Sequence, residues 1–140
     1  MDRVTFCKML AIAKQRSGKT TSDLCYELRK MPTDIRRIER GLSNFRMDRC
    51  FNYLEIIGYC IYIERFDGRE YHYFDKPEQL SAWLKTDTAG KWQSLQRINN
   101  ELGYSRGYIN RFIDGSSIMS IDTFLSLAEY FSYDIQLLDV

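Results

Sequence analysis

Apolar and polar residues alternate with a helical period through most of the first sixty positions. In the first stretch, four apolar residues recur at this spacing before Ser17-Gly18 ends the pattern: Phe6, Met9, Leu10 and Ala13. They lie on one face of a helix expected at about residues 3–16. The same reasoning predicts a second helix that follows Thr21-Ser22-Asp23 and ends near Arg29, a third at about 32–40 and a fourth at about 47–57.

After residue 58 the pattern changes to β-branched and aromatic residues. Two such runs, at 60–66 and 69–74, flank Asp67-Gly68. Runs of this kind on both sides of a two-residue turn signal predict a β-hairpin. With Asp67-Gly68 as the loop, Arg65 faces Glu70 and Tyr62 faces Tyr73.

Helical spacing returns after Lys76-Pro77. Helices are expected at about 77–86, 93–102, 106–113 and 121–131, and Tyr133 to Asp139 is expected to form a terminal strand. The segment Thr86 to Lys91 is rich in turn residues, so the helix before it is expected to be shorter than the one at 3–16. Trp83 and Trp92 are expected in the core.

The second helical set repeats the first at an offset of 74 residues without a gap. When 24–63 is aligned with 98–137, ten of the forty positions are identical: Glu27/Glu101, Leu28/Leu102, Ile35/Ile109, Arg37/Arg111, Gly41/Gly115, Ser43/Ser117, Asp48/Asp122, Glu55/Glu129, Tyr59/Tyr133 and Ile61/Ile135. Unrelated segments would share roughly one position in sixteen to twenty. The chain therefore contains one hydrophobic framework twice, which can supply an approximate two-fold symmetry within one chain.

The predicted fold class is mainly α, with two tandem units joined by the hairpin. Residues 1–64 form the first repeat and its terminal strand, residues 65–76 form the return strand and a connector, and residues 77–140 form the second repeat and its terminal strand. An isolated two-stranded hairpin is marginally stable in water. The strands at about 60–65, 69–74 and 134–139 are therefore expected to share one small antiparallel sheet.

Charge is distributed unevenly between the two halves. Residues 1–64 contain 12 Lys and Arg against 8 Asp and Glu, whereas residues 65–140 contain 8 against 11. The first half thus carries +4 and the second −3, which sum to the net charge of +1. A polyanion would be attracted mainly by the first repeat.

Other chemistry is not indicated by the composition. No apolar run approaches the roughly 18 residues of a membrane span, and the N-terminus lacks a signal-peptide core, so a cytoplasmic protein with no membrane partner is expected. The four cysteines are far apart and predict reduced thiols: Cys7, Cys25, Cys50 and Cys60. The single histidine, His72, is expected at the surface. No metal, cofactor, small-molecule substrate or enzymatic activity is predicted.

Two helices separated by a turn of about four residues carry the most specific motif. Leu24-Cys25 and Leu28 precede the run from Ile35 to Gly41, and Leu102-Gly103 precedes the run from Ile109 to Gly115. These segments resemble the Cro/phage-repressor (XRE-type) helix-turn-helix family in two tandem copies. Arg29 stands where that family favours glycine, because the backbone there is left-handed. The resemblance implies that the second helix of each motif presents a face to the DNA major groove.

Carried over from the family, the base-reading positions lie at the start and on the outer face of that helix. They are Thr33, Arg36 and Arg37 in the first repeat and Arg106, Tyr108, Asn110 and Arg111 in the second. Arginine can bind guanine, and asparagine adenine, through two hydrogen bonds. Positions that could approach phosphates are Lys14, Arg16, Lys19, Arg40, Arg46 and Arg49.

The expected function is that of a sequence-specific regulator of transcription that binds double-stranded DNA as a single-chain pseudo-dimer. Some XRE-type regulators are antitoxins, so a protein partner such as a toxin is a further candidate. The alternative is a protein-protein interaction module that keeps the fold without binding DNA. The near-neutral net charge, the acidic second half, and Asp34 and Gly107 at contact positions favour that alternative.

Overall fold

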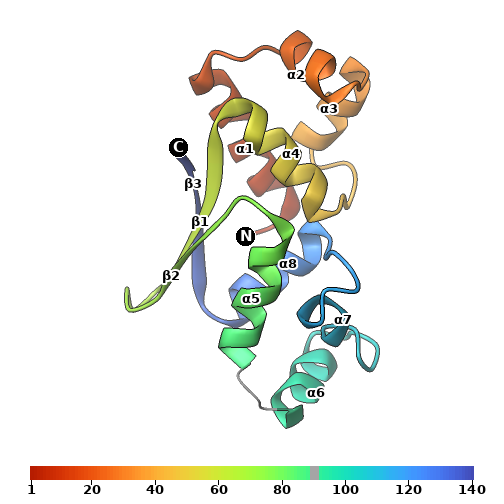
Figure 1. Cartoon of the computed structure of the whole chain (residues 1–140), viewed down its shortest axis with the longest axis vertical. Helices are drawn as coiled ribbons and strands as arrows, with labels where there is room; N and C mark the ends of the chain where they lie inside the picture. Colours follow the sequence, from red (N-terminus) through yellow and green to blue (C-terminus); the bar gives the residue numbers. More distant parts are fainter. Residues whose placement is uncertain (89–91) are drawn as a thin grey trace.

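The computed structural model describes residues 1–88 and 92–140, which form helices packed on a small sheet (Figure 1). The first repeat contains four helices and a strand: α1 (Arg3–Ser17), α2 (Thr21–Leu28), α3 (Pro32–Glu39), α4 (Met47–Ile57) and β1 (Tyr59–Arg65). After β2 (Tyr71–Phe74), the same order of elements follows again: α5 (Pro77–Thr88), α6 (Trp92–Glu101), α7 (Asn110–Ile113), α8 (Ile121–Tyr130) and β3 (Tyr133–Asp139).

Local capping explains where the first helices begin and end. Asp2 accepts a hydrogen bond from the Thr5 amide at 2.8 Å and starts α1, and Gly18 ends α1 with a left-handed backbone (φ +78°). Thr20 and Asp23 form a capping box at the start of α2. The residues expected to precede α2 are therefore its first turn. Arg29, with φ +53°, has the left-handed backbone expected at its position.

The hairpin has the predicted register and a wider turn than predicted. Tyr62 pairs with Tyr73, and the Arg65 amide donates to the Glu70 carbonyl at 2.9 Å. β1 ends at Arg65 and β2 begins at Tyr71, so five residues, 66–70, connect the strands instead of two. A two-residue type I′ turn needs positive φ at both central residues, and in this loop Gly68 alone has it.

The three strands form one antiparallel sheet in the order β2-β1-β3, as predicted. The pairing of β1 with β3 is symmetric about the repeat, because Tyr62 pairs with Gln136, which lies 74 residues further along the chain. A second contact between the repeats also pairs residues that are 74 positions apart. Arg46 forms a bridge with Ser120, the Met47 amide donates to the Met119 carbonyl at 2.9 Å, and the Ile121 amide donates to the Phe45 carbonyl at 2.8 Å. Both contacts place equivalent residues opposite each other, so the repeats are joined with pseudo-two-fold symmetry.

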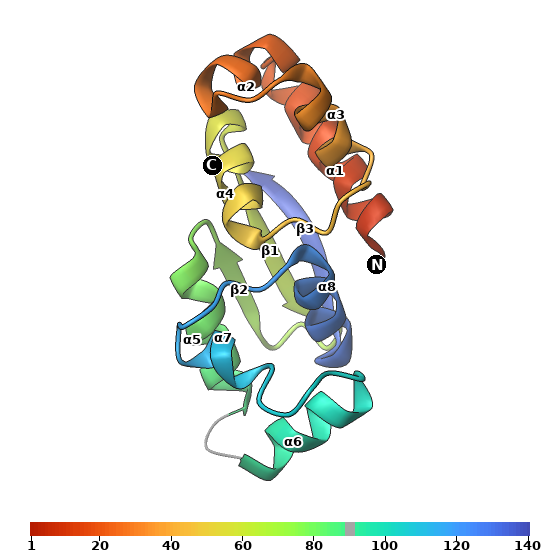
Figure 2. The same cartoon turned by 90° about the vertical axis from the view of Figure 1, so that its right-hand side faces the viewer.

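The helices cover one face of the sheet, and a single core runs through both repeats (Figure 1). Buried aromatic rings from β2, α5 and α8 meet at its centre, where Trp83 packs against Phe74 and Phe124. Trp83 is thus in the core as expected, while the side chain of Trp92 lies outside the described residues. Figure 2 shows α4 and α8 near the middle of the molecule and α2 and α6 at its two ends.

Two expectations about length have different outcomes. Helix α5 continues to Thr88 and is shorter than α1 by three residues, 12 against 15, and residues 89–91 of the expected turn lie outside the described part. Helix α7 contains four residues, so the helix expected at 106–113 is wrong in its first half. In the described residues, no helix is both long and apolar enough to cross a membrane.

Candidate nucleic-acid interface

Helix α3 lies on the side of the molecule away from the sheet (Figure 1), and it carries the predicted base-reading residues of the first repeat. Pro32 occupies its first turn, and the Asp34 carboxylate accepts a hydrogen bond from the Met31 amide at 3.2 Å. Ile35 is fully buried beneath the helix and fixes its rotation. As a result three predicted side chains are exposed: Thr33, Arg36 and Arg37.

Three cations converge on a hollow of about 290 Å³ beside α3. Lys30 comes from the turn before α3, Arg37 from α3 and Arg49 from the first turn of α4, and all three are exposed. Asp34 also lines the hollow, but its carboxylate is already engaged by the Met31 amide. Within the described residues, none of the three cations has a carboxylate oxygen within 4.0 Å. The hollow is therefore a concentration of positive charge that suits an anion such as a phosphate.

Lys30 was not singled out by the sequence pattern. The family motif describes the two helices and gives no role to the end of the turn between them. A usable signal was present, since Lys30 comes two residues before Pro32, where α3 begins.

The structure corrects the role expected for Lys14. Its ammonium lies 2.8 Å from the Glu39 carboxylate, its side chain is only 15% exposed, and Tyr53 donates to the same carboxylate at 2.9 Å. This group joins α1, α3 and α4 inside the first repeat. Helical spacing alone did not reveal it, because Lys14 lies at the edge of the buried face of α1. Lys14 is thus a packing residue that cannot reach a phosphate without breaking this pair.

The other cations predicted to approach phosphates differ in how free they are. Arg46 makes two hydrogen bonds to the Asp48 carboxylate, at 2.7 and 3.3 Å, and this pair raises the pKa of Arg46 and lowers the pKa of Asp48. Lys19 lies 3.9 Å from Glu27. Arg16 and Arg40 are exposed, and in the described part of the chain they have no ion pair.

In the second repeat, the backbone at the equivalent of the start of α3 is not helical. Gly107, at the position of Thr33, has φ +78°, a left-handed conformation that cannot occur within a right-handed helix. Residues 106–109 form turns, and α7 begins only at Asn110. Of the predicted base-reading residues, Arg106 and Arg111 are exposed and Asn110 is half-buried.

Tyr108, also predicted to read bases, is directed into the domain. Its hydroxyl lies 2.9 Å from that of the buried Thr123, and its ring packs 4.6 Å from the Tyr104 ring and 5.0 Å from Phe112. Tyr104 and Thr123 are the equivalents of Lys30 and Arg49 at the offset of 74 residues. The place of the basic hollow is thus taken by uncharged, packed side chains in the second repeat.

A separate polar cluster lies between the hairpin and α5. Single ligand-type atoms of Glu70, His72 and Asp87 lie within 4.8 Å of one another, and Arg65 lies 3.3 Å from Glu70 and 3.4 Å from Asp87. The Tyr133 hydroxyl donates to Glu70 at 3.0 Å, and this bond and Arg65 lower the pKa of Glu70. His72 is half-buried there instead of being a free surface residue. Arg65 balances one of the two carboxylate charges, and its pair with Asp87 is the internal one, because the Asp87 side chain is 2% exposed whereas that of Glu70 is 48% exposed.

The cysteines are all reduced, as the sequence predicts. Cys7 and Cys50 are buried, while Cys25 and Cys60 are half-buried. Burial raises the pKa of Cys7 to about 11 and raises the pKa of Cys50 further. Both buried thiols therefore stay protonated at neutral pH and are poor nucleophiles.

Comparisons with family models, curated proteins and solved structures find no match to this chain. What bears on its function is therefore the chain itself: its internal repeat, the symmetric joining of the repeats and the cations around α3.

Proposed function

We propose that this protein binds double-stranded DNA as a sequence-specific transcriptional regulator of the helix-turn-helix type. The observation that carries the proposal is the set of cations around α3. Lys30, Arg37 and Arg49 surround one hollow, and Arg36 and Arg40 extend the exposed positive surface of the helix. Such a surface can neutralise phosphates on both sides of a groove while an arginine side chain reaches a guanine.

The joining of the repeats supports binding as a single-chain pseudo-dimer. Proteins that read two DNA half-sites usually provide two-fold symmetry by dimerisation. Here β1 pairs with β3, and residues 45–47 pair with 119–121, with equivalent residues opposite each other in both places. Helices α3 and α7 are consequently presented on the same face of the molecule (Figure 2).

The two repeats make unequal contributions in this proposal. The first repeat carries the basic hollow and an eight-residue α3, whereas the second has a four-residue α7 and packed tyrosines. The first repeat therefore provides most of the phosphate attraction and base contact. The second contributes through Arg106, Arg111 and Asn110, so the preferred site consists of two dissimilar half-sites about one helical turn apart.

The salt dependence of binding tests the proposal. Binding of a labelled duplex of random sequence is measured by fluorescence anisotropy over a series of salt concentrations. The variant Lys30→Gln/Arg37→Gln/Arg49→Gln is expected to reduce the slope of log K against log salt by about 0.9 per lost phosphate contact, hence by about 2 to 3.

A matched control removes three cations away from α3. The variant Arg69→Gln/Lys85→Gln/Arg97→Gln changes the net charge by the same amount and is expected to leave the slope nearly unchanged. Equal effects of the two triple variants would show that binding follows net charge alone. Absence of binding by the unmodified protein at low salt would refute the proposal.

A second candidate function is that of an interaction module for another protein. It is favoured by the second repeat, where Tyr104 and Tyr108 fill the hollow and Gly107 breaks the recognition helix. Selection from a random duplex library separates the two candidates. Enrichment of a sequence supports the regulator, whereas weak binding with no enriched sequence supports the interaction module.

A further inference from the structure

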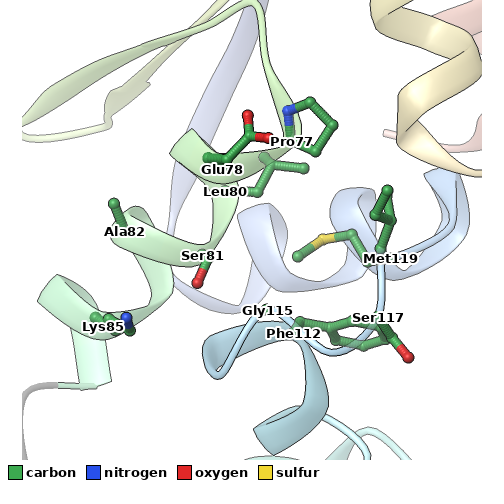
Figure 3. Close-up of a pocket in the computed structure, with 11 residues that line it drawn as sticks. Pro77, Glu78, Leu80, Ser81, Ala82, Lys85, Phe112, Gly115, Ser117 and Met119 are labelled. Carbon is green, nitrogen blue, oxygen red and sulfur yellow. The ribbon is translucent and has the colours of Figure 1, made fainter.

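The second repeat contains a cavity of about 410 Å³ between α5 and the loop that joins α7 to α8 (Figure 3). Its floor is made of three buried apolar side chains: Leu80, Phe112 and Met119. Sites for small molecules are commonly apolar hollows of about 300–1,000 Å³ with a few polar groups at their edges. The cavity is large enough for such a ligand. It lies in the second repeat, whereas the cations around α3 lie in the first.

The first repeat shows that this fold does not require the cavity. Gly41 and Val4 are the equivalents of Gly115 and Glu78. A Cβ atom added at Gly41 would lie 3.1 Å from Val4 Cα, so α1 packs directly against this turn. A Cβ atom added at Gly115 would have no neighbour within 4 Å. The space between the first helix of the repeat and the turn after its third helix is therefore closed in the first repeat and open in the second.

Charged groups stand at the two ends of the cavity. Glu78 lies in the first turn of α5 beside Pro77, and Lys85 lies two turns further along the helix (Figure 3). Lys85 is exposed and, within the described residues, has no ion pair. The nearby Asp114 carboxylate accepts a hydrogen bond from the Ser116 amide at 2.8 Å. Lys85 is consequently the group with which an anionic ligand would pair.

We propose that this cavity binds a small, mostly apolar carboxylate, whose body lies on Leu80, Phe112 and Met119 and whose charge faces Lys85. An aromatic or branched aliphatic acid has this chemistry. The ligand would touch both α5 and α7, which are joined by a hydrogen bond of 2.7 Å from the Ser81 hydroxyl to the Ile113 carbonyl. Because α7 carries Arg111, occupancy would set how this helix is presented to DNA; this last consequence rests on the proposed function.

The direct test uses 2-naphthoate as the probe and needs no DNA. Titration is followed by the NMR signal of the Met119 methyl group and by naphthalene fluorescence. The probe is expected to shift the Met119 signal saturably at millimolar concentrations. Lys85→Gln is expected to weaken binding of 2-naphthoate about three- to fivefold, which is the effect of one exposed ion pair. The neutral analogue 2-naphthylmethanol should bind this variant and the unmodified protein equally.

Lys8→Gln is the matched control, because Lys8 is an exposed cation on α1, the equivalent helix of the first repeat. It should change neither titration. Three results would overturn the proposal: no shift at Met119 with either probe, equal weakening by Lys8→Gln, or tighter binding of the cation 2-naphthylmethylammonium than of 2-naphthoate. The effect on DNA is measured separately by repeating the anisotropy titration with saturating 2-naphthoate. A failure of DNA binding therefore leaves the result for the cavity intact.

Discussion

Around the third helix, the two repeats use equivalent positions for different purposes. In the first repeat, Lys30 and Arg49 are exposed cations beside a hollow. In the second, Tyr104 and Thr123 hold these positions and contact Tyr108, which fills the space. Replacement of charged by packing residues at a few positions has thus changed a surface without changing the order of the helices.

At the turn that follows the third helix, the first repeat is the packed one and the second repeat is the one with a hollow. The first repeat is closed there by contact between Gly41 and α1, while the second has the cavity beside Gly115. The framework tolerates both states because the repeats are held by backbone pairing, through β1 and β3 and through residues 45–47 and 119–121. Backbone hydrogen bonds do not depend on which side chains line the hollows.

The buried ion pair of the first repeat has a natural neutral counterpart. Lys14, Glu39 and Tyr53 correspond to Thr88, Ile113 and Leu127, which carry no charge. Thr88 and Leu127 are buried, and the Thr88 hydroxyl bonds to the Leu84 carbonyl within its own helix. The comparison predicts that Lys14, Glu39 and Tyr53 can be replaced by their neutral equivalents only when all three are replaced together.

Lys14→Thr alone should give the largest loss of stability. It leaves the Glu39 carboxylate, 13% exposed, without its cation, and breaking a pair of this kind costs about 3 kcal/mol. The triple variant Lys14→Thr/Glu39→Ile/Tyr53→Leu copies the second repeat and should recover most of this loss. Urea unfolding followed by circular dichroism measures both. A triple variant as unstable as the single one would show that the two repeats are not interchangeable here.

The two glycines at the end of the third helix provide the next largest contrast. Gly41→Ala places a Cβ atom against Val4 and strains a backbone of φ +68°, so a loss of about 2 to 3 kcal/mol in unfolding free energy is expected. Gly115→Ala strains φ without a collision and should cost about 1 kcal/mol. Equal losses in urea unfolding would mean that the turn after the third helix is packed equally tightly in both repeats.

Arg37 and Arg111 occupy identical positions and test the division of DNA contact. Sequence reasoning expects Arg37→Ala and Arg111→Ala each to cost about 1 to 3 kcal/mol at the best site if both helices read bases. Because α7 has lost its first turns, the structure predicts this loss for Arg37→Ala and a smaller one for Arg111→Ala. Anisotropy on the selected site and on random duplex measures the difference, and a larger effect at Arg111 would reverse the proposed roles.

The smallest expected effect separates free from paired arginines within the first repeat. Arg36 is exposed and has no ion pair among the described residues, whereas Arg46 is held by Asp48. Arg36→Gln should therefore lower the salt slope of DNA binding by up to about 0.9, and Arg46→Gln by less than half of that. If Arg46→Gln has the larger effect, DNA must displace Asp48 from this arginine.

The sequence by itself determined the elements whose causes are local. The period of the apolar residues located α4 at Met47–Ile57 and the terminal strand at Tyr133–Asp139. The turn signal Asp67-Gly68 predicted the pairing of Tyr62 with Tyr73, although the loop itself has more than two residues. Each of these depends on neighbours along the chain or on one turn, so the pattern of residues contains the information.

Only the tertiary structure decided which polar groups meet. A lysine can serve a phosphate or a carboxylate, and Lys14 pairs with Glu39 because α1 packs against α3. Tyr108 is directed inward because Gly107 turns the backbone before α7. The cluster of Arg65 and Asp87 joins residues from a strand and a separate helix. Partners far apart in the chain are chosen by packing, since a buried charge must find a counter-charge wherever the fold places one.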